Sequence, residues 1–294
     1  MGNNNIDHFS VFEKIIFKCS RDFMSDKRYA QWSMKRWFGD FDVENPNTFN
    51  EKIQWLKLYN RKDLYTQLVD KYSVREYVAS TLDEKYLSEL IGVWDRAEQI
   101  NFDELPDSFV LKTTQASGTN IIVNEKSKLN IDDTLKKLNN WLEVNYYKVG
   151  REWAYKNVKP RIICEELLSD QEGNIPTDFK FFCFNGRPAY IQLDLDRFGS
   201  HERVFYDTQW NHQSFGLYYP KSNKTVPKPD NLDEMIELAK KLSKDIPFCR
   251  VDFYTLPKIV FGEITFYPGN GIEAFHPAEW DLKFGDLLDL PSVD

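Results

Sequence analysis

Residues 248–271 read FCRVDFYTLPKIVFGEITFYPGNG, and this segment carries the clearest structural pattern in the chain. Its alternation of apolar and polar residues predicts two strands, 248–254 and 258–265. The segment Thr255-Leu256-Pro257-Lys258 has the composition of a turn between them. The loop Pro268-Gly269-Asn270-Gly271 follows directly. Its two glycines allow the backbone to turn and to aim N–H groups at an anion, although most such loops are plain turns.

Two carboxylates and an arginine fall on one face of this predicted hairpin. Side chains alternate along a strand, and a two-residue loop at Leu256-Pro257 would set Arg250 opposite Glu263, with Asp252 on the adjacent diagonal. Such neighbours lie about 5–8 Å apart. One or two Mg²⁺ ions could then bridge the carboxylates and the oxygens of a triphosphate. The alternative is a surface hairpin with an Arg250–Glu263 ion pair, but the surrounding apolar residues favour an interior position.

The bulk composition limits the classes of protein to consider. A chain of 294 residues with 41% hydrophobic residues suggests two or three compact units and excludes disorder. A net charge of −8 argues against nucleic-acid partners and permits a local ATP site. The four cysteines lack metal-site spacing, so we expect reduced, buried thiols. Neither a signal peptide nor a membrane span is predicted, so we expect a soluble, intracellular protein.

Helical periodicity marks several further segments. Residues 6–40 carry seven basic and five acidic residues, so this predicted helix packs on the body of the protein or lies on a membrane surface. Thr48 and Glu51 have capping-box spacing at the start of the next helix. The predicted helix 64–80 contains Asp70-Lys71. Helices are also predicted over 131–145 and 231–245, the latter with a cap pair of Asn231 and Glu234. Asn185-Gly186 predicts a tight hairpin.

Candidate nucleotide-binding residues precede the hairpin in the chain. Lys112 ends an apolar strand before the small turn Ser117-Gly118-Thr119, where it could neutralise phosphates. Glu165-Glu166-Leu167-Leu168 closes a buried strand whose edge could present backbone groups to adenine. Asp178 and Lys180 share one face of the next strand, where they could meet ribose and phosphate. An ordinary polar sheet face is the alternative for each of these residues.

These pieces, in this order, resemble the ATP-grasp superfamily, and most fully its TupA-like members of bacterial teichuronopeptide and surface-polysaccharide synthesis. The resemblance runs from about residue 45 to the end of the chain. It rests on residues 48–56 (TFNEKIQWL), 68–72 (LVDKY), 109–112 (FVLK), 178–181 (DFKF) and 261–269 (FGEITFYPG).

The resemblance implies an α+β fold that clamps ATP between two antiparallel-sheet subdomains. The expected division is a mainly helical region 1–100, a lid subdomain 101–168, and a C-terminal subdomain 169–294 with the metal site. It also implies roles for single residues. For ATP they are Lys71, Lys112, Ser117, Gly118, Glu165, Glu166, Leu168, Asp178 and Lys180. For catalysis they are Arg250 and Lys180, and for Mg²⁺ Asp252, Glu263 and Thr265. Thr265 stands where many ATP-grasp enzymes have a metal-binding asparagine.

The implied activity is that of a cytoplasmic bacterial ligase, with peripheral membrane contact possible. A substrate carboxylate takes the γ-phosphate of ATP to give an acyl phosphate, and an amine then displaces phosphate to give an amide. On family grounds the carboxylate is a uronic acid of a capsular or cell-wall polysaccharide, and the amine is an amino acid or amino alcohol. The residues expected to bind the acceptor substrate are Arg197, His201, Arg203, Gly269, Asn270 and Gly271; for Arg197, His201 and Arg203 the alternative is solvated loop charges.

Other functions remain compatible with the sequence. The same ATP site could serve a small-molecule kinase or a peptide ligase. Asp194-Leu195-Asp196 formally fits the metal motif of a sugar-nucleotide glycosyltransferase, although it follows a hairpin and not a βαβ unit. The aromatic content also suits a non-catalytic carbohydrate-binding protein.

Overall fold

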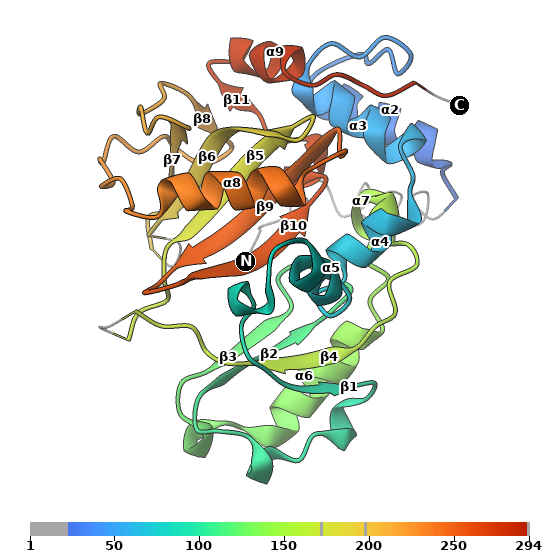
Figure 1. Ribbon diagram of the computed structural model, residues 1–294. Coiled ribbons are helices and arrows are strands. Elements are labelled where there is room, and N and C mark those ends of the chain that lie inside the picture. Colours follow the sequence, from blue (N-terminus) through green and yellow to red (C-terminus); the bar gives the residue numbers. More distant parts are fainter. Residues whose placement is uncertain (1–22, 171–172, 197–198, 293–294) are drawn as a thin grey trace.

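Two antiparallel sheets form the framework of the protein (Figure 1). The computed structural model describes residues 23–170, 173–196 and 199–292. The large sheet has five strands in the order β10-β9-β5-β6-β7, and the small sheet has four in the order β1-β4-β2-β3. The described part of the chain is therefore of the α+β class, as expected.

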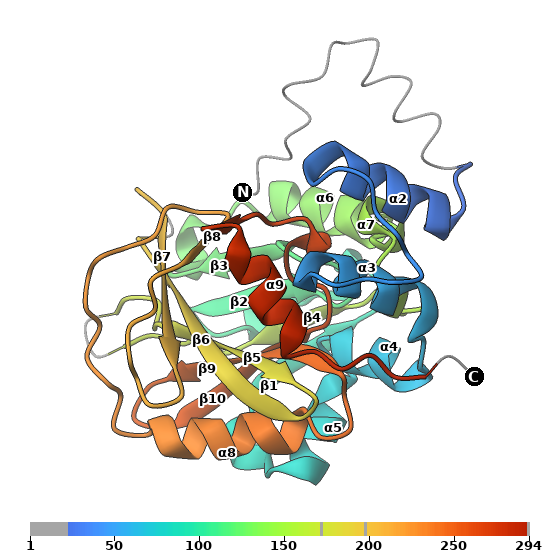
Figure 2. The ribbon, with the colours of Figure 1, turned by 90° about the horizontal axis from the view of Figure 1, so that it is seen from above.

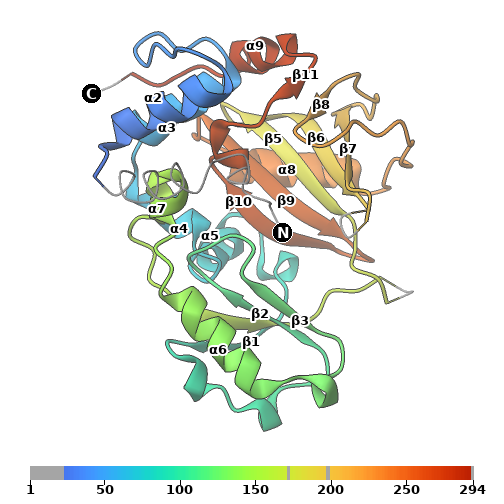
Figure 3. The ribbon, with the colours of Figure 1, turned by 180° about the vertical axis from the view of Figure 1, so that it is seen from behind.

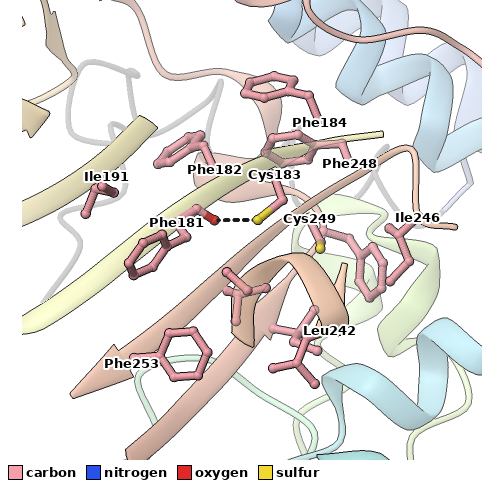
Figure 4. Packing of buried hydrophobic residues seen from close by; sticks show 14 of the residues in the cluster. Phe181, Phe182, Cys183, Phe184, Ile191, Leu242, Ile246, Phe248, Cys249 and Phe253 are labelled. Atoms are coloured by element: carbon pink, nitrogen blue, oxygen red, sulfur yellow. Dashed lines mark hydrogen bonds between the residues drawn. The ribbon is translucent and has the colours of Figure 1, made fainter. Parts of the chain in front are cut away.

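The large sheet is built from the second half of the chain. Its strands are β5 (Asp178–Phe184), β6 (Arg187–Leu195), β7 (Glu202–Asp207), β9 (Phe248–Thr255) and β10 (Ile259–Thr265). Helix α8 (Leu232–Leu242) packs on the face that carries Phe181 and Phe253, whereas Phe248 lies on the opposite face with Phe182 and Phe184 (Figure 4). The predicted tight hairpin is confirmed, because Asn185 (φ 49°) and Gly186 (φ 75°) both adopt the left-handed conformation of a two-residue turn.

The small sheet has its own core. Its strands are β1 (Leu90–Trp94), β2 (Phe109–Thr113), β3 (Asn120–Val123) and β4 (Ile162–Glu165). One face packs against α6 (Ile131–Leu142) through Phe109, Leu111, Cys164 and Leu138. Strand alternation therefore turns Val110, Lys112 and Glu165 to the opposite face. Strand β1 precedes residue 101, so the sheet draws on a segment that the expected division assigns to the helical region.

Helices join and flank the two sheets. They are α2 (Asp26–Trp37), α3 (Phe49–Tyr59), α4 (Asp63–Val69), α5 (Val74–Thr81), α7 (Tyr147–Gly150) and α9 (Glu279–Asp286). Helix α3 lies beside α9, and Lys52 donates to the carbonyl of Gly285 at 2.8 Å (Figure 2). The short two-stranded sheet consists of β8 (Gly216–Leu217) and β11 (Phe275–His276). Six 3₁₀ turns complete the described elements: η2 (Glu84–Tyr86), η3 (Ala97–Gln99), η4 (Phe102–Glu104), η5 (Lys126–Lys128), η6 (Trp153–Tyr155) and η7 (Pro268–Gly271).

Two helix predictions are wrong in detail. The segment 64–80 is not one helix, because Asp70 Oδ1 accepts hydrogen bonds from the backbone N–H groups of Tyr72 (2.9 Å) and Ser73 (3.3 Å) and ends α4. The Asn231 side chain does not cap α8, because its Oδ1 accepts from the Thr255 hydroxyl at 3.2 Å instead of from the backbone of the first turn. The capping box of Thr48 and Glu51 is confirmed at the start of α3.

The remaining predictions concern the termini, the thiols and the membrane. Helix α2 occupies part of the predicted segment 6–40, and residues 6–22 lie outside the described residues. Cys164, Cys183 and Cys249 are buried free thiols, as expected, while Cys19 is outside the described range. Over the described residues, no helix has the length and hydropathy that a membrane crossing requires.

Candidate active site

The hairpin of β9 and β10 has a register that the sequence does not reveal. Asp252 lies opposite Glu263, and Arg250 lies opposite Thr265. The predicted opposition of Arg250 and Glu263 is wrong, because the loop contains three residues and a bulge at Gly262 shifts the pairing. A Cβ atom at residue 262 would stand 3.1 Å from the Asp252 carbonyl oxygen. The bulge therefore sets both carboxylates side by side.

Arg250 holds the two carboxylates together. Its Nε donates to Asp252 Oδ1 at 2.7 Å, and its Nη2 donates to Asp252 Oδ2 at 2.7 Å and to Glu263 Oε1 at 2.9 Å. Asp252 is 2% exposed. Burial raises the pKa of Asp252 to about 6, against the opposing effects of Arg250 and Lys180. Burial also pushes the pKa of Glu263 up, but Arg250, Lys71 and Lys180 outweigh burial and hold that pKa below its usual value.

Thr265 supports Glu263 in this arrangement. Its hydroxyl donates to Glu263 Oε1 at 3.1 Å and accepts from Arg250 Nη2 at 3.3 Å. In the described part of the chain, no three His, Cys, Asp or Glu residues gather as a metal site. Asp252 and Glu263 nevertheless fit Mg²⁺, which is commonly held by one or two carboxylates together with waters and phosphate oxygens. The Glu263 side chain is 41% exposed, so its oxygens can reach a ligand.

Lys180 joins the neighbouring strand to this site. It lies opposite Asp252 in the pairing of β5 with β9. Its Nζ forms ion pairs with Asp178, with Asp252 Oδ2 (3.3 Å) and with Asp194 Oδ2 (4.0 Å). Burial lowers the pKa of Lys180, but the surrounding carboxylates outweigh burial and raise it overall. Asp178 is buried beside Lys180, so both predicted residues of β5 belong to the same cluster.

The small sheet supplies a second group of charges around Glu165. Lys112 Nζ lies 2.6 Å from Glu165 Oε2, and Arg75 Nη1 lies 2.8 Å from Glu165 Oε1. The Ser88 hydroxyl also donates to Oε1 at 2.7 Å. The Glu166 N–H donates to the Glu89 carbonyl at 3.1 Å. These contacts fasten the end of β4 to the segment before β1, and Leu168 lies in the linker that continues toward β5.

Lys71 connects the two sheets at the break between α4 and α5. Its backbone N–H donates to the Thr114 carbonyl at 3.4 Å, and its Nζ donates to the Ala116 carbonyl. Burial lowers the pKa of Lys71, while the charge of Glu263 raises it. Helices α4 and α5 lie between the two sheets (Figure 3), and at their junction Lys71 contacts the β2–β3 loop and is acted on by the charge of Glu263 in β10. Ser117 and Gly118 are exposed at the tip of that loop.

The glycine loop after β10 is fixed to α3. Gly269 (φ 55°), Asn270 (φ 59°) and Gly271 (φ 66°) are all left-handed. Lys57 Nζ donates to Asn270 Oδ1 at 2.7 Å, and Gln54 Nε2 donates to the Asn270 carbonyl at 2.8 Å. These hydrogen bonds therefore hold the glycine loop on α3, beside the hairpin of β9 and β10.

The residues expected to bind the acceptor substrate lie around Asp194, one of the three carboxylates that pair with Lys180. Arg203 is 8% exposed, and its guanidinium donates to Asp194 Oδ1 (2.9 Å), to Glu273 Oε2 (3.0 Å) and to the Leu217 carbonyl (3.0 Å). His201 Nε2 lies 3.2 Å from Asp194 Oδ1, and its ring packs on Tyr219. Arg203 and His201 thus contact Asp194 directly, and Arg197 lies outside the described residues.

Arg75 and Asp194 also contact these charged groups and were not predicted as site residues from the sequence. Asp194 could not have been found, because the register that follows from the Asn185-Gly186 turn would pair Lys180 with Ile191, and a bulge between Phe182 and Cys183 shifts its partner to Gln192, whose face Asp194 shares. Arg75 could not be found either, because its contact with Glu165 spans 90 residues and depends on how α5 packs.

Asp194 and Asp196 do not form a common metal site. Asp194 contacts Arg203, whereas Asp196 Oδ2 accepts from the Ser200 N–H at 2.8 Å.

The chain matches the model of a known protein family over most of its length. The family model described as TupA-like ATPgrasp matches residues 51–289. No match was found among curated proteins. Solved structures that resemble the chain include D-alanine–D-alanine ligase from Bacillus anthracis complexed with ATP, at 15% identity, a TM-score of 0.39, and coverage of 68% of this chain and 53% of that chain.

Two further solved structures are similar at the same level. The ADP complex of N5-carboxyaminoimidazole ribonucleotide synthetase has 10% identity, a TM-score of 0.44, and coverage of 74% of this chain and 50% of that one. The ATP-grasp ligase PsnB, complexed with a precursor peptide and AMPPNP, has 10% identity, a TM-score of 0.35, and coverage of 74% and 57%. The chain thus spans about half the length of these three proteins.

Proposed function

Because the chain belongs to the TupA-like ATP-grasp family, we propose that it is an ATP- and Mg²⁺-dependent carboxylate–amine ligase. The observation that carries this proposal is the side-by-side placement of Asp252 and Glu263 under the Arg250 guanidinium, at 2.7 and 2.9 Å. Lys180 pairs with Asp252 at 3.3 Å, and Lys71 adds a positive charge that acts on Glu263. Such an arrangement gathers cations and oxygen ligands where a triphosphate needs them.

The nucleotide would lie between the two sheets. Lys71 and Lys112, with the loop at Ser117 and Gly118, would hold its phosphates, and Lys180 would add a third cation. Asp178 would meet the ribose, and the chain from Glu165 and Glu166 to Leu168 would border the adenine. Since the Glu165 carboxylate already binds Lys112 and Arg75, we assign adenine recognition to backbone groups of this segment.

Arg250 would stabilise the phosphoryl group during its transfer. Its guanidinium is buried against Asp252 and reaches Glu263, so it is pre-oriented for an anion at the exposed side of Glu263. Mg²⁺, held by Asp252 and Glu263 with Thr265 beside them, would offset negative charge on the phosphates. The glycine loop Gly269-Asn270-Gly271 would border the acyl phosphate, with Arg203 and His201 on the acceptor side.

We propose a uronic acid of a bacterial surface polysaccharide as the carboxylate substrate and an amino acid or amino alcohol as the amine. The likeness to the TupA-like family supports this choice. We place the reaction in the cytoplasm, where ATP is available, with peripheral membrane contact through α2 compatible with its basic residues.

The test is ADP release with Mg·ATP, hexuronates and a panel of amines. A ligase requires both substrates and yields one amide for each ADP. ADP formed at full rate without any amine would instead indicate a kinase. Amide formed only from peptide carboxylates would indicate a peptide ligase.

A further inference from the structure

Glu152, between α7 and η6, is a buried carboxylate that the fold does not use. It is 8% exposed, and no residue in the described ranges gives its carboxylate a hydrogen bond or an ion pair. Taking such a group out of water without a partner is unfavourable, so its presence is not explained by stability. Buried groups of this kind are expected where a ligand provides the missing contact.

The segment that carries Glu152 lies against the glycine loop of the proposed active site. A Cβ atom at Gly150 would stand 2.5 Å from Asn270 Oδ1, so this segment packs directly on the loop. Lys57 carries the opposite charge that acts on Glu152, but its ammonium donates to Gln54 Oε1 (2.9 Å), Asn270 Oδ1 (2.7 Å) and the Asn270 carbonyl (3.3 Å). Lys57 therefore fixes the loop and leaves Glu152 without a direct contact.

Two tyrosines connect Glu152 to the hairpin of β9 and β10. The rings of Tyr146 and Tyr155 pack edge to face, with centroids 4.8 Å apart. Burial raises the pKa of both hydroxyls, and the charges of Glu152 and Glu263 raise them further. Tyr155 also ends the 3₁₀ turn η6 that begins after Glu152, and its backbone N–H donates to the Glu152 carbonyl at 3.1 Å. Aromatic faces and carboxylates each attract cations, so a ligand that fits here carries a positive charge.

We propose that Glu152, with the rings of Tyr146 and Tyr155, binds the ammonium group of the amine substrate and accepts its proton before attack. This inference rests on the proposed ligase function. One N–H proton moves to the Glu152 carboxylate, and the freed electron pair forms the C–N bond to the acyl carbon. The C–O bond to phosphate then breaks, and phosphate leaves with that electron pair and takes up the second N–H proton.

The ionisation of Glu152 suits a base at neutral pH. Burial raises the pKa of Glu152 to about 7; Lys57 lowers it and Glu263 raises it further. A general base is most effective when its pKa lies near the working pH. The groups that face Glu152 from the surrounding elements are Lys57 of α3, Glu263 of β10, and Tyr146, Tyr155 and Tyr267.

The test compares a charged with an uncharged nucleophile. Wild type, Glu152→Gln and the exposed control Glu143→Gln receive Mg·ATP, glucuronate or galacturonate, and either ethanolamine or hydroxylamine. Hydroxylamine is largely uncharged at neutral pH and needs no base. We expect Glu152→Gln to form hydroxamate at the wild-type rate but to form the ethanolamine amide about 10²-fold more slowly. Glu143→Gln should match wild type with both nucleophiles.

Each other outcome has one meaning. Unchanged amide formation in Glu152→Gln overturns the inference. An equal loss of hydroxamate and amide also overturns it, because Glu152 would then serve phosphoryl transfer. If Glu152→Gln melts several degrees below wild type, Glu152 is a structural partner of Lys57. That result would overturn the inference, and measuring it requires no substrate. A wild-type protein that forms no hydroxamate from either uronate contradicts the proposed substrate class, while the melting temperature still decides on Glu152.

Discussion

Asp252 combines deep burial with a pKa close to neutrality. Burial raises that pKa to about 6. At pH 7 the neutral form of Asp252 is therefore only about 1.4 kcal/mol less stable than the charged form. An asparagine at residue 252 imitates the neutral form and should be tolerated by the fold. The side chain is therefore suited to a change in charge when a ligand arrives.

The first prediction concerns the two carboxylates. Asp252→Asn and Glu263→Gln each remove a proposed Mg²⁺ ligand and keep the side-chain shape. We expect each to lower kcat for Mg·ATP turnover by at least about 10²-fold, with melting temperatures near that of wild type. ADP release and thermal melts measure both. Full activity in both variants would remove Asp252 and Glu263 from the active site.

The second prediction concerns Lys112. Lys112→Met removes a proposed phosphate ligand, while Arg75 still pairs with Glu165. We expect the KM for ATP to rise about tenfold, which corresponds to about 1.4 kcal/mol. Lys159→Met is the control, because Lys159 belongs to the same subdomain and is 62% exposed in a pair with Asp95. An equal KM in the two variants would exclude Lys112 from the nucleotide site.

Among the elements, the contact with α3 holds the glycine loop in place beside the hairpin of β9 and β10. A Cβ atom at Gly271 would stand 2.6 Å from Ile53 Cγ2 and 2.8 Å from Gln54 Nε2. Gly271→Ala should therefore lower the free energy of unfolding by about 2–4 kcal/mol, which chemical denaturation measures. Gly118→Ala is the matched control, since Gly118 is also left-handed (φ 73°) but has open space around it. Equal losses in the two variants would show that backbone strain alone, and not packing on α3, acts at Gly271.

Elements with strong local signals could be predicted from the sequence. The capping box at Thr48, the Asn185-Gly186 turn and the alternation in 248–265 each depend on residues within a few positions. The bulge at Gly262 could not be predicted, because strand register depends on packing across the sheet. The break between α4 and α5 at Asp70 could not be predicted either, because Asp70 is held by Arg161, 91 residues away, as well as by its local turn. The same limit explains why Arg75 and Glu152 were missed.

At the scale of the whole molecule, Glu152 should make stability depend on pH. Its pKa is about 7 in the folded protein, against an ordinary 4.5, so the folded state holds the proton more tightly than the unfolded chain. A raised pKa of this kind adds stability below pH 4.5, and that stability is lost as pH rises to about 7. We expect the melting temperature of Glu152→Gln, relative to wild type, to rise over this window by an amount equivalent to about 2 kcal/mol. A constant difference between the two proteins from pH 4.5 to 7.5 would contradict a buried, unpaired carboxylate.

The pairing of Arg250 with Asp252 and Glu263 has a practical consequence for handling the protein. Both carboxylates already have a counter-ion within the chain, so the fold does not require a metal, unlike small zinc domains that unfold when chelated. Treatment with EDTA should abolish turnover yet leave the melting temperature within about 1 °C, and added Mg²⁺ should restore activity. A large fall in melting temperature on chelation would contradict this. Metal-free protein can accordingly be purified, stored and crystallised, and the metal added only when the reaction is to begin.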